Sequence, residues 1–140
     1  MKQENKEILL KDICARLPYR LKCSFGVDDA IYEITGINPS ACGASEIQAT
    51  HVKSSINGDF KLNSCKPYLF PLSSMSEEQK REYSRRQHDI ELVDELGCIV
   101  KEVGLFDSPE SFEYLIENHF DYRGLIPMGI ALDATGKNIY

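Results

Sequence analysis

The apolar residues near the start of the chain follow the period of an α-helix. From Ile8 to Leu17 they recur about every four positions, and charged residues such as Asp12 lie between them. Pro18 follows, and the residue before a proline is driven out of the helical conformation. The pattern therefore predicts an amphipathic helix within residues 1–17, with charged residues such as Asp12 on its polar face.

From Pro18 to Leu72 the apolar period changes to two, which is typical of strands. Alternating runs begin near residues 21, 31 and 46, and residues 36–43 have the composition of a loop. Asn57-Gly58 is the dipeptide that best fits a two-residue hairpin turn, which would place a further strand from Phe60.

Residues 18–72 are therefore expected to form a small antiparallel meander. Closing such a meander into a barrel removes its exposed edges, and we favour an SH3-like barrel over an open sheet covered by helices. The segment 66–72 contains two prolines and the large apolar side chains of Tyr68, Leu69 and Phe70, so we expect it to leave the sheet as a partly buried strap.

Two helix-start signals lie in the remaining part of the chain, residues 73–140. Ser76 and Gln79 have the spacing of a capping box, which predicts a helix over 76–87. Ser108 followed by proline predicts a helix over 109–119, with Phe112 and Leu115 among its core-facing residues. Residues 89–106 could extend the first helix, but the Val and Ile residues after Gly97 favour a hairpin.

Together these elements predict an α+β fold that occupies a single domain, residues 1–140. It consists of an N-terminal helix, a small antiparallel meander or SH3-like barrel, and C-terminal helices packed on it. The apolar fraction of 42% and the charged fraction of 27% are ordinary for a globular domain. No apolar run approaches the roughly 18 residues of a membrane span, so we expect a cytoplasmic protein without a membrane partner.

The net charge of −6 is unevenly distributed and bears on the kind of partner. Residues 1–71 carry nine Lys/Arg against eight Asp/Glu, whereas residues 72–140 carry seven against fourteen. An acidic surface repels phosphate, so the distribution disfavours nucleic acid and favours a protein partner.

Cysteine and histidine usage offers no metal or redox motif. The five cysteines (Cys14, Cys23, Cys42, Cys65 and Cys98) form no Cys-x-x-Cys pair, and the three histidines show no ligand spacing. We therefore expect reduced, mostly buried thiols and neither a metal nor a cofactor.

The densest group of reactive residue types is His119, Asp121, Tyr122 and Arg123, directly before Gly124. A histidine at a helix end favours the helix dipole, and Asp121 could pair with Arg123 or cap the next turn. This structural interpretation accounts for most of the motif. The alternative is an acid/base pair formed by His119 and Asp121, or an anion site at Arg123.

Three segments carry a resemblance to a protein family. Residues 66–78 (KPYLFPLSSMSEE), 111–115 (SFEYL) and 119–126 (HFDYRGLI) resemble a group of small uncharacterised proteins from gut Bacteroidales, their phages and mobile elements. The resemblance covers most of residues 60–135. It implies a phage or mobile-element context in a bacterial cell, and no chemical activity.

These observations define three functional hypotheses. The first and favoured one is a non-enzymatic protein-interaction or accessory module. The second is a nucleic-acid-associated accessory protein that uses the face of the barrel, where aromatic residues such as Tyr32 and Phe60 could stack on bases. The third is a small enzyme centred on His119 and Asp121.

Overall fold

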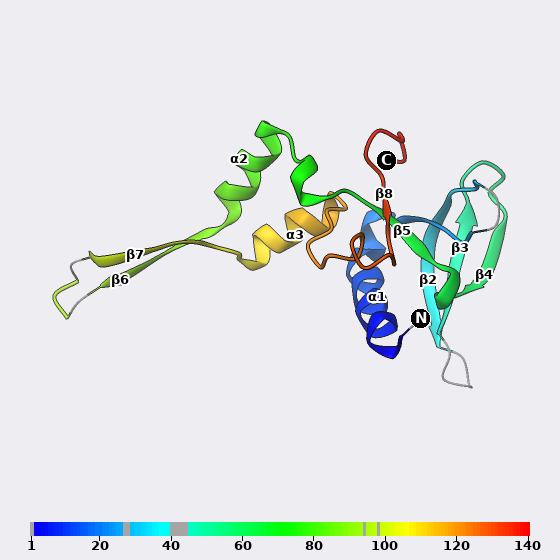
Figure 1. Ribbon diagram of the computed structural model, residues 1–140, viewed down its shortest axis with the longest axis horizontal. Coiled ribbons are helices and arrows are strands. Elements are labelled where there is room, and N and C mark those ends of the chain that lie inside the picture. The colour runs from blue at the N-terminus through cyan, green and yellow to red at the C-terminus, as the bar shows by residue number, and fades with distance from the viewer. Residues whose placement is uncertain (1, 27–28, 40–44, 94, 98) are drawn as a thin grey trace. The chain divides into compact units, whose positions relative to one another are not determined.

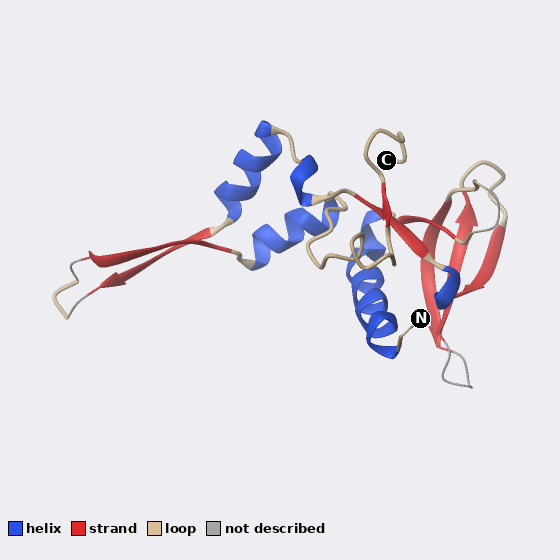
Figure 2. Cartoon of the chain, in the orientation of Figure 1, coloured by secondary structure: helices blue, strands red, loops and turns tan. Residues whose placement is uncertain are grey.

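The computed structural model describes residues 2–26, 29–39, 45–93, 95–97 and 99–140. Helices and a mostly antiparallel sheet are both present, which confirms the α+β class (Figure 2). The chain divides into two compact units that we describe separately: the sheet unit, residues 1–74 and 119–140, and the hairpin unit, residues 75–118. Within the described residues, no helix is both long enough and apolar enough to cross a membrane.

The predicted N-terminal helix is confirmed as α1 (Gln3–Arg16). It ends two residues before Pro18, and a 3₁₀ turn, η1 (Leu17–Tyr19), carries the chain out of the helix. One face of α1 is fully buried and includes both Leu9 and Asp12. The placement of Asp12 on a polar, solvated face was therefore wrong.

The sheet unit contains a six-stranded sheet in the order β4-β3-β2-β1-β5-β8 (Figure 1). The strands are β1 (Lys22–Ser24), β2 (Tyr32–Pro39), β3 (Ser45–His51), β4 (Asn57–Lys61), β5 (Lys66–Leu69) and β8 (Leu132–Asp133). Strands β1 to β4 form the predicted antiparallel meander, whereas β8 pairs with β5 in parallel.

The SH3-like barrel was a wrong prediction, because the sheet is open. Its edges are β4 and β8, and no ladder joins them within the described residues. The physical reason is the cover that α1 provides: Leu9 and Ile13 share one core with Ile34 and Ile47 of the sheet. A sheet whose apolar face is covered by a helix buries that face without curling onto itself.

The turn predicted at Asn57-Gly58 was also wrong, because both residues belong to β4. The turn lies before them and is organised by His51, whose Nδ1 accepts hydrogen bonds from the backbone of Lys53 (3.2 Å) and Ser54 (3.1 Å). Ser55 adopts a left-handed conformation (φ 58°) that completes the reversal. Side-chain capping by the histidine thus replaces the backbone preference of Asn-Gly.

Two further segments differ from prediction at the strand level. The expected loop over 36–43 begins as part of β2, where the register shifts between Ile34 and Gly36, and residues 40–43 lie outside the described part of the chain. The expected strap over 66–72 does not leave the sheet, because its first four residues form β5 between β1 and β8. Pro67 lies opposite Cys23 of β1, and the pairing of β5 with β8 begins only at the next residue, Tyr68.

An aromatic cluster fills one end of the core of the sheet unit. The rings of Phe25 and Phe60 are stacked at 3.9 Å between centroids, and Tyr32 meets both edge-on at 5.3 and 5.0 Å. Phe25 retains only 3% of its accessible surface. These rings pack against one another, as the core interpretation predicted.

The hairpin unit contains α2 (Glu77–Arg86), β6 (His88–Val93), β7 (Ile99–Phe106) and α3 (Pro109–Glu117). Both helices begin with a complete capping box, formed by Ser76 with Gln79 and by Ser108 with Ser111. The hairpin predicted over 89–106 is confirmed by the antiparallel pairing of β6 with β7.

The buried face of α3 differs from the predicted one. Ser111, Tyr114 and Leu115 are buried, whereas Phe112 keeps 40% of its surface exposed. Phe112 lies about 100° around the helix from Ser111, because each residue advances an α-helix by that angle. The small serine, and not the phenylalanine, therefore faces inward.

Candidate functional site

His119 is held in the interior of the sheet unit by backbone conformation and ring stacking. It adopts a left-handed φ of 60° and is 6% exposed, and its ring stacks on Tyr140 with 3.9 Å between centroids. Burial, helped by the nearby charges of Arg16 and Lys22, lowers the pKa of His119 to about 4, and a hydrogen bond to the backbone of Tyr19 opposes this shift only in part. The imidazole is therefore neutral at neutral pH.

Asp121 uses both of its carboxylate oxygens to cap the turn that follows it. Oδ1 accepts from the backbone N–H of Leu125 at 2.8 Å, and Oδ2 accepts from Ile126 at 2.9 Å. Asp121 was predicted either to pair with Arg123 or to cap the next turn, and the structure shows the cap. A carboxylate that is occupied in this way cannot serve as a free base unless the turn opens.

Arg123 does not pair with Asp121 but lies beside Asp12 of α1. Its Nε is 3.3 Å from Asp12 Oδ1, while Arg16 Nε is 2.9 Å from Asp12 Oδ2. A second guanidinium nitrogen of Arg16 donates to the carbonyl of Phe120 at 2.6 Å. The guanidinium groups of Arg16 and Arg123 also lie 5.7 and 4.9 Å from the ring centre of Tyr122. We call Asp12, Arg16, Tyr122 and Arg123 the Asp12 cluster.

The Asp12 cluster ties α1 to the C-terminal segment. Asp12 and Arg16 are fully buried, and buried charges are tolerated only when they are paired and hydrogen-bonded. Sequence reasoning missed both residues, although a signal was present: Asp12 and Arg16 are spaced i, i+4 on the same face as Leu9 and Ile13.

Tyr140 ties the strands of the same unit together at its hydroxyl group. The hydroxyl accepts from the backbone N–H of Lys22 in β1 and donates to the carbonyl of Tyr68 in β5, both at 2.9 Å. Lys22 Nζ in turn donates to the carbonyl of Ile139 at 2.7 Å. With His119 stacked on its ring, Tyr140 connects the predicted motif to the sheet.

A second candidate region lies in the hairpin unit, at the root of the β6–β7 hairpin. The side chain of Asp107 accepts hydrogen bonds from the hydroxyl of Tyr83, from Gln87 Nε2 at 3.3 Å and from Ser111 Oγ at 3.0 Å. Gln87 and Asp107 are the residues directly before β6 and directly after β7. We call this arrangement the Asp107 clamp, because it joins the two ends of the hairpin.

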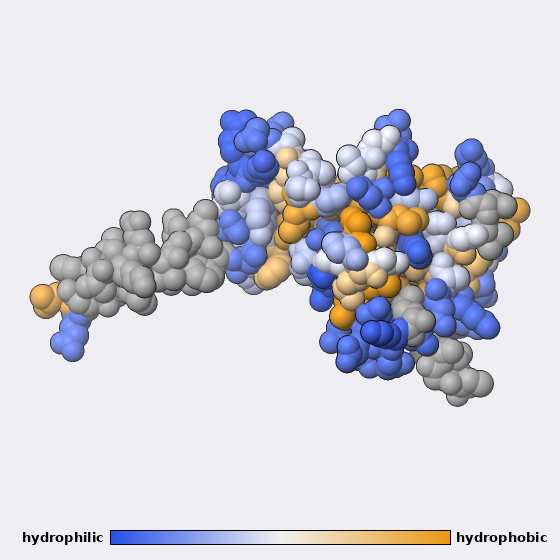
Figure 3. Space-filling model, viewed as in Figure 1, coloured by the Kyte–Doolittle hydropathy of each residue, from blue (hydrophilic) through white to orange (hydrophobic). Residues whose placement is uncertain are grey.

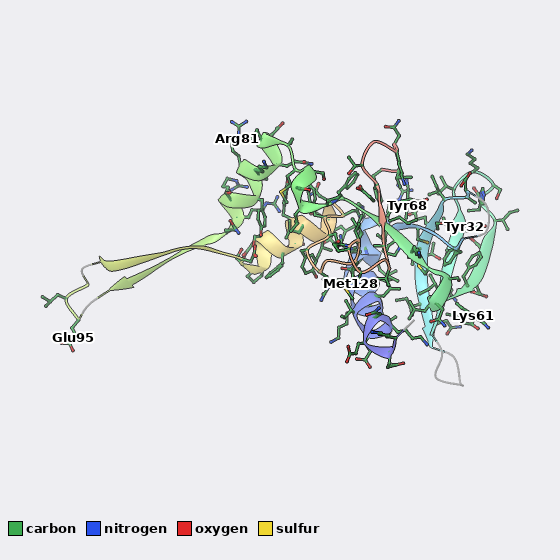
Figure 4. All side chains as sticks on the ribbon, in the orientation of Figure 1. Tyr32, Lys61, Tyr68, Arg81, Glu95 and Met128 are labelled. Atoms are coloured by element: carbon green, nitrogen blue, oxygen red, sulfur yellow. The ribbon has the colours of Figure 1, made fainter. Side chains whose placement is uncertain are left out.

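Contacts of Arg86 hold the two helices of the hairpin unit together. Arg86 lies 4.9 Å from the ring centre of Tyr114 and 3.4 Å from Glu117 Oε1, both in α3. Arg85 and Arg86 also hydrogen-bond to Glu82 and lower the pKa of its carboxyl group to about 2. Figure 3 shows hydrophilic residues gathered over α2, and Arg81 projects outward from this helix in Figure 4.

The hairpin itself extends away from α2 and α3 as a two-stranded ribbon (Figure 1), with Glu95 at its tip (Figure 4). Strands β6 and β7 form a separate sheet, and no third strand joins them in the described part of the chain. The hairpin unit carries five Lys/Arg against twelve Asp/Glu, a net charge of −7, whereas the sheet unit carries eleven against ten. Residues 88–106 alone carry one lysine against five acidic residues.

The cysteines of the chain differ in exposure. Cys23 and Cys65 are buried free thiols, Cys14 is exposed, and Cys42 and Cys98 lie outside the described residues. Two of the three described cysteines are therefore buried, as the expectation of mostly buried thiols has it. Among the described residues, no three or more His, Cys, Asp or Glu side chains form a group that could hold a metal ion.

No family model, curated protein or solved structure matches this chain. The resemblance of residues 66–78, 111–115 and 119–126 to proteins of Bacteroidales phages and mobile elements therefore stays a prediction.

Proposed function

We propose that this chain is a non-enzymatic protein-interaction module of phage or mobile-element origin, and that it works in the cytoplasm of a bacterial cell. Its partner is a protein with a basic surface, and the hairpin unit makes the contact. The observation that carries the proposal is the two-stranded ribbon of β6 and β7, whose ends the Asp107 clamp joins. Isolated two-stranded sheets are only marginally stable in water, so such a ribbon gains stability from a partner.

The charge distribution supports a protein partner over nucleic acid. The hairpin unit has a net charge of −7, and an acidic surface repels phosphate groups. The sheet unit has a net charge of only +1, and the rings of Phe25, Tyr32 and Phe60 are occupied with one another. Basic protein surfaces, in contrast, are attracted to the hairpin unit.

The positions of His119 and Asp121 favour a structural role over the small-enzyme hypothesis. The ring of His119 is stacked on Tyr140, and both oxygens of Asp121 hold backbone N–H groups. Using either side chain for proton transfer would require these contacts to break first.

A comparison of the full chain with a hairpin-deleted variant tests the proposal. The variant replaces residues 89–105 with a short Gly-Ser linker. Gln87 and Asp107 are hydrogen-bonded to each other, so a short linker can join the two ends of the deletion. Both proteins are tagged, expressed in Bacteroidales cells and recovered with their bound proteins for quantitative mass spectrometry. A partner is then purified and its affinity for each protein is measured by calorimetry.

We expect a basic protein that binds the full chain and loses at least tenfold in affinity for the hairpin-deleted variant. The double variant Gln48→Ala/Asp59→Ala, on the exposed side of the sheet, is the control and should bind as the full chain does. Equal affinity for the full chain and the deletion variant, or a partner lost after nuclease treatment, contradicts the proposal.

A further inference from the structure

Strand β6 presents the more regular of the two edges of the β6–β7 hairpin. Its outer edge, on the side away from β7, has no paired strand among the described residues. Its six residues, His88–Val93, contain neither proline nor glycine. A regular edge of this kind is a template on which another chain can pair.

Strand β7, in contrast, is irregular. The register shifts twice along the hairpin, between the pairs Ile90↔Gly104 and Glu91↔Glu102, and between Leu92↔Lys101 and Val93↔Ile99. Each shift leaves one extra residue on β7, at Val103 and at Val100. Bulges twist a strand and blunt its edge against pairing, so the outer edge of β6 is the better site for an added strand.

The sequence of β6 defines the chemistry of a strand that would fit this edge. Successive positions of a strand alternate between its two faces, so the acidic positions 89 and 91 share one face of β6, and the apolar positions 90 and 92 share the other. Glu102, the register partner of Glu91, adds a third acidic residue at this point of the hairpin. Basic residues at alternate positions of an added strand would complement these acidic positions in charge.

From these positions we infer that β6 binds an extended protein segment that adds a third strand to the hairpin and carries Lys or Arg at alternate positions. This rests on the proposed function, which it deepens by naming the mode of binding and the chemistry of the partner. The backbone of the added strand pairs with the outer edge of β6. Its basic residues lie on the same face as Asp89 and Glu91, and its apolar residues lie on the face of Ile90 and Leu92.

The test uses the full chain and a fluorescent peptide in which Lys and Val alternate, with binding followed by fluorescence anisotropy. Two further peptides are methylated on the backbone nitrogens of either the valines or the lysines. Both keep the charge of the parent peptide, but each loses the N–H donors of one edge only, because successive N–H groups of a strand point to opposite sides. Strand addition uses one edge, so the two methylated peptides should differ in affinity by at least about tenfold.

Two charge variants of the protein locate the site. Asp89→Asn/Glu91→Gln should weaken binding of the parent peptide by about five- to thirtyfold. Glu110→Gln/Glu113→Gln removes the same number of charges from exposed positions of α3 and should change the affinity by less than about twofold. Circular dichroism of each variant checks that the secondary structure is retained.

Three results would overturn the inference: no binding of the parent peptide, equal binding of the two methylated peptides, or equal weakening by the two charge variants. The last two would show attraction by net charge alone. The capture experiment with the hairpin-deleted variant is independent of these peptides. If a hairpin-dependent partner is recovered although the alternating peptide fails, the proposed function stands and strand addition is wrong.

Discussion

Protonation of His119 should make the sheet unit less stable as the pH falls below 6.5. The pKa of His119 is about 4 in the folded chain, against an ordinary value of 6.5, because burial and the charges of Arg16 and Lys22 disfavour the imidazolium ion. The unfolded chain therefore binds the proton first. The contribution of neutral His119 to stability is complete above pH 6.5, is lost as the pH falls from 6.5 to about 4, and stays constant below that value.

The size of this effect follows from the pKa difference between the two states. One pKa unit corresponds to about 1.4 kcal/mol, so a shift from 6.5 to about 4 amounts to about 3 kcal/mol of unfolding free energy. Most of it falls between pH 7 and pH 4.5, where we expect a loss of about 2 kcal/mol from this residue alone.

His119→Asn is the matched variant for this measurement. Asparagine tolerates the left-handed backbone conformation that His119 adopts, but it does not titrate. Urea unfolding at pH 7 and pH 4.5 gives, for each protein, the loss of unfolding free energy between the two pH values. The carboxyl groups contribute equally to both losses, so the difference between the wild-type loss and the variant loss isolates His119. The wild-type protein should lose about 2 kcal/mol more than the variant. Equal losses, or an NMR titration of the His119 ring with a midpoint near 6.5, would refute the reasoning.

Three substitutions test other parts of the fold through urea or thermal unfolding. Arg16→Met should lower the unfolding free energy by about 3 kcal/mol, because it leaves the buried Asp12 with Arg123 alone. The double variant Asp12→Leu/Arg16→Met should restore part of this loss, and a double variant less stable than the single one would contradict the reasoning. Phe120→Ala should cost about 3 to 5 kcal/mol, since this side chain is 2% exposed, and an unchanged melting temperature would remove it from the core. Ser76→Ala should cost about 1 kcal/mol in the hairpin unit by breaking the capping box of α2, and unchanged helix melting would argue against that bond.

Features encoded within a few residues could be predicted from the sequence. The start of α2 depends on the spacing of Ser76 and Gln79, and the start of α3 depends on Ser108 and the proline that follows it. The β6–β7 hairpin was predicted from the β-branched residues after Gly97. Each of these signals acts on its own backbone, so its outcome does not depend on distant parts of the chain.

Features that depend on distant contacts could not be predicted. The open sheet requires β5 and β8 to meet, and β8 lies more than sixty residues further along the chain. Burial of Arg16 depends on the carbonyl of Phe120, 104 residues away. The turn at His51 replaced the one expected at Asn57-Gly58, because a histidine ring can accept backbone hydrogen bonds and this ability is not part of the usual turn preferences.

The Asp107 clamp also has a consequence for the evolution and engineering of this chain. Because Gln87 and Asp107 are hydrogen-bonded to each other, the chain leaves and re-enters the helical base at nearly the same point. An insert with adjacent ends can be lengthened, shortened or exchanged at little cost to the scaffold that carries it. Residues 88–106 therefore form a replaceable cassette, and a new binding specificity can be grafted between Gln87 and Asp107 while the two capped helices stay unchanged.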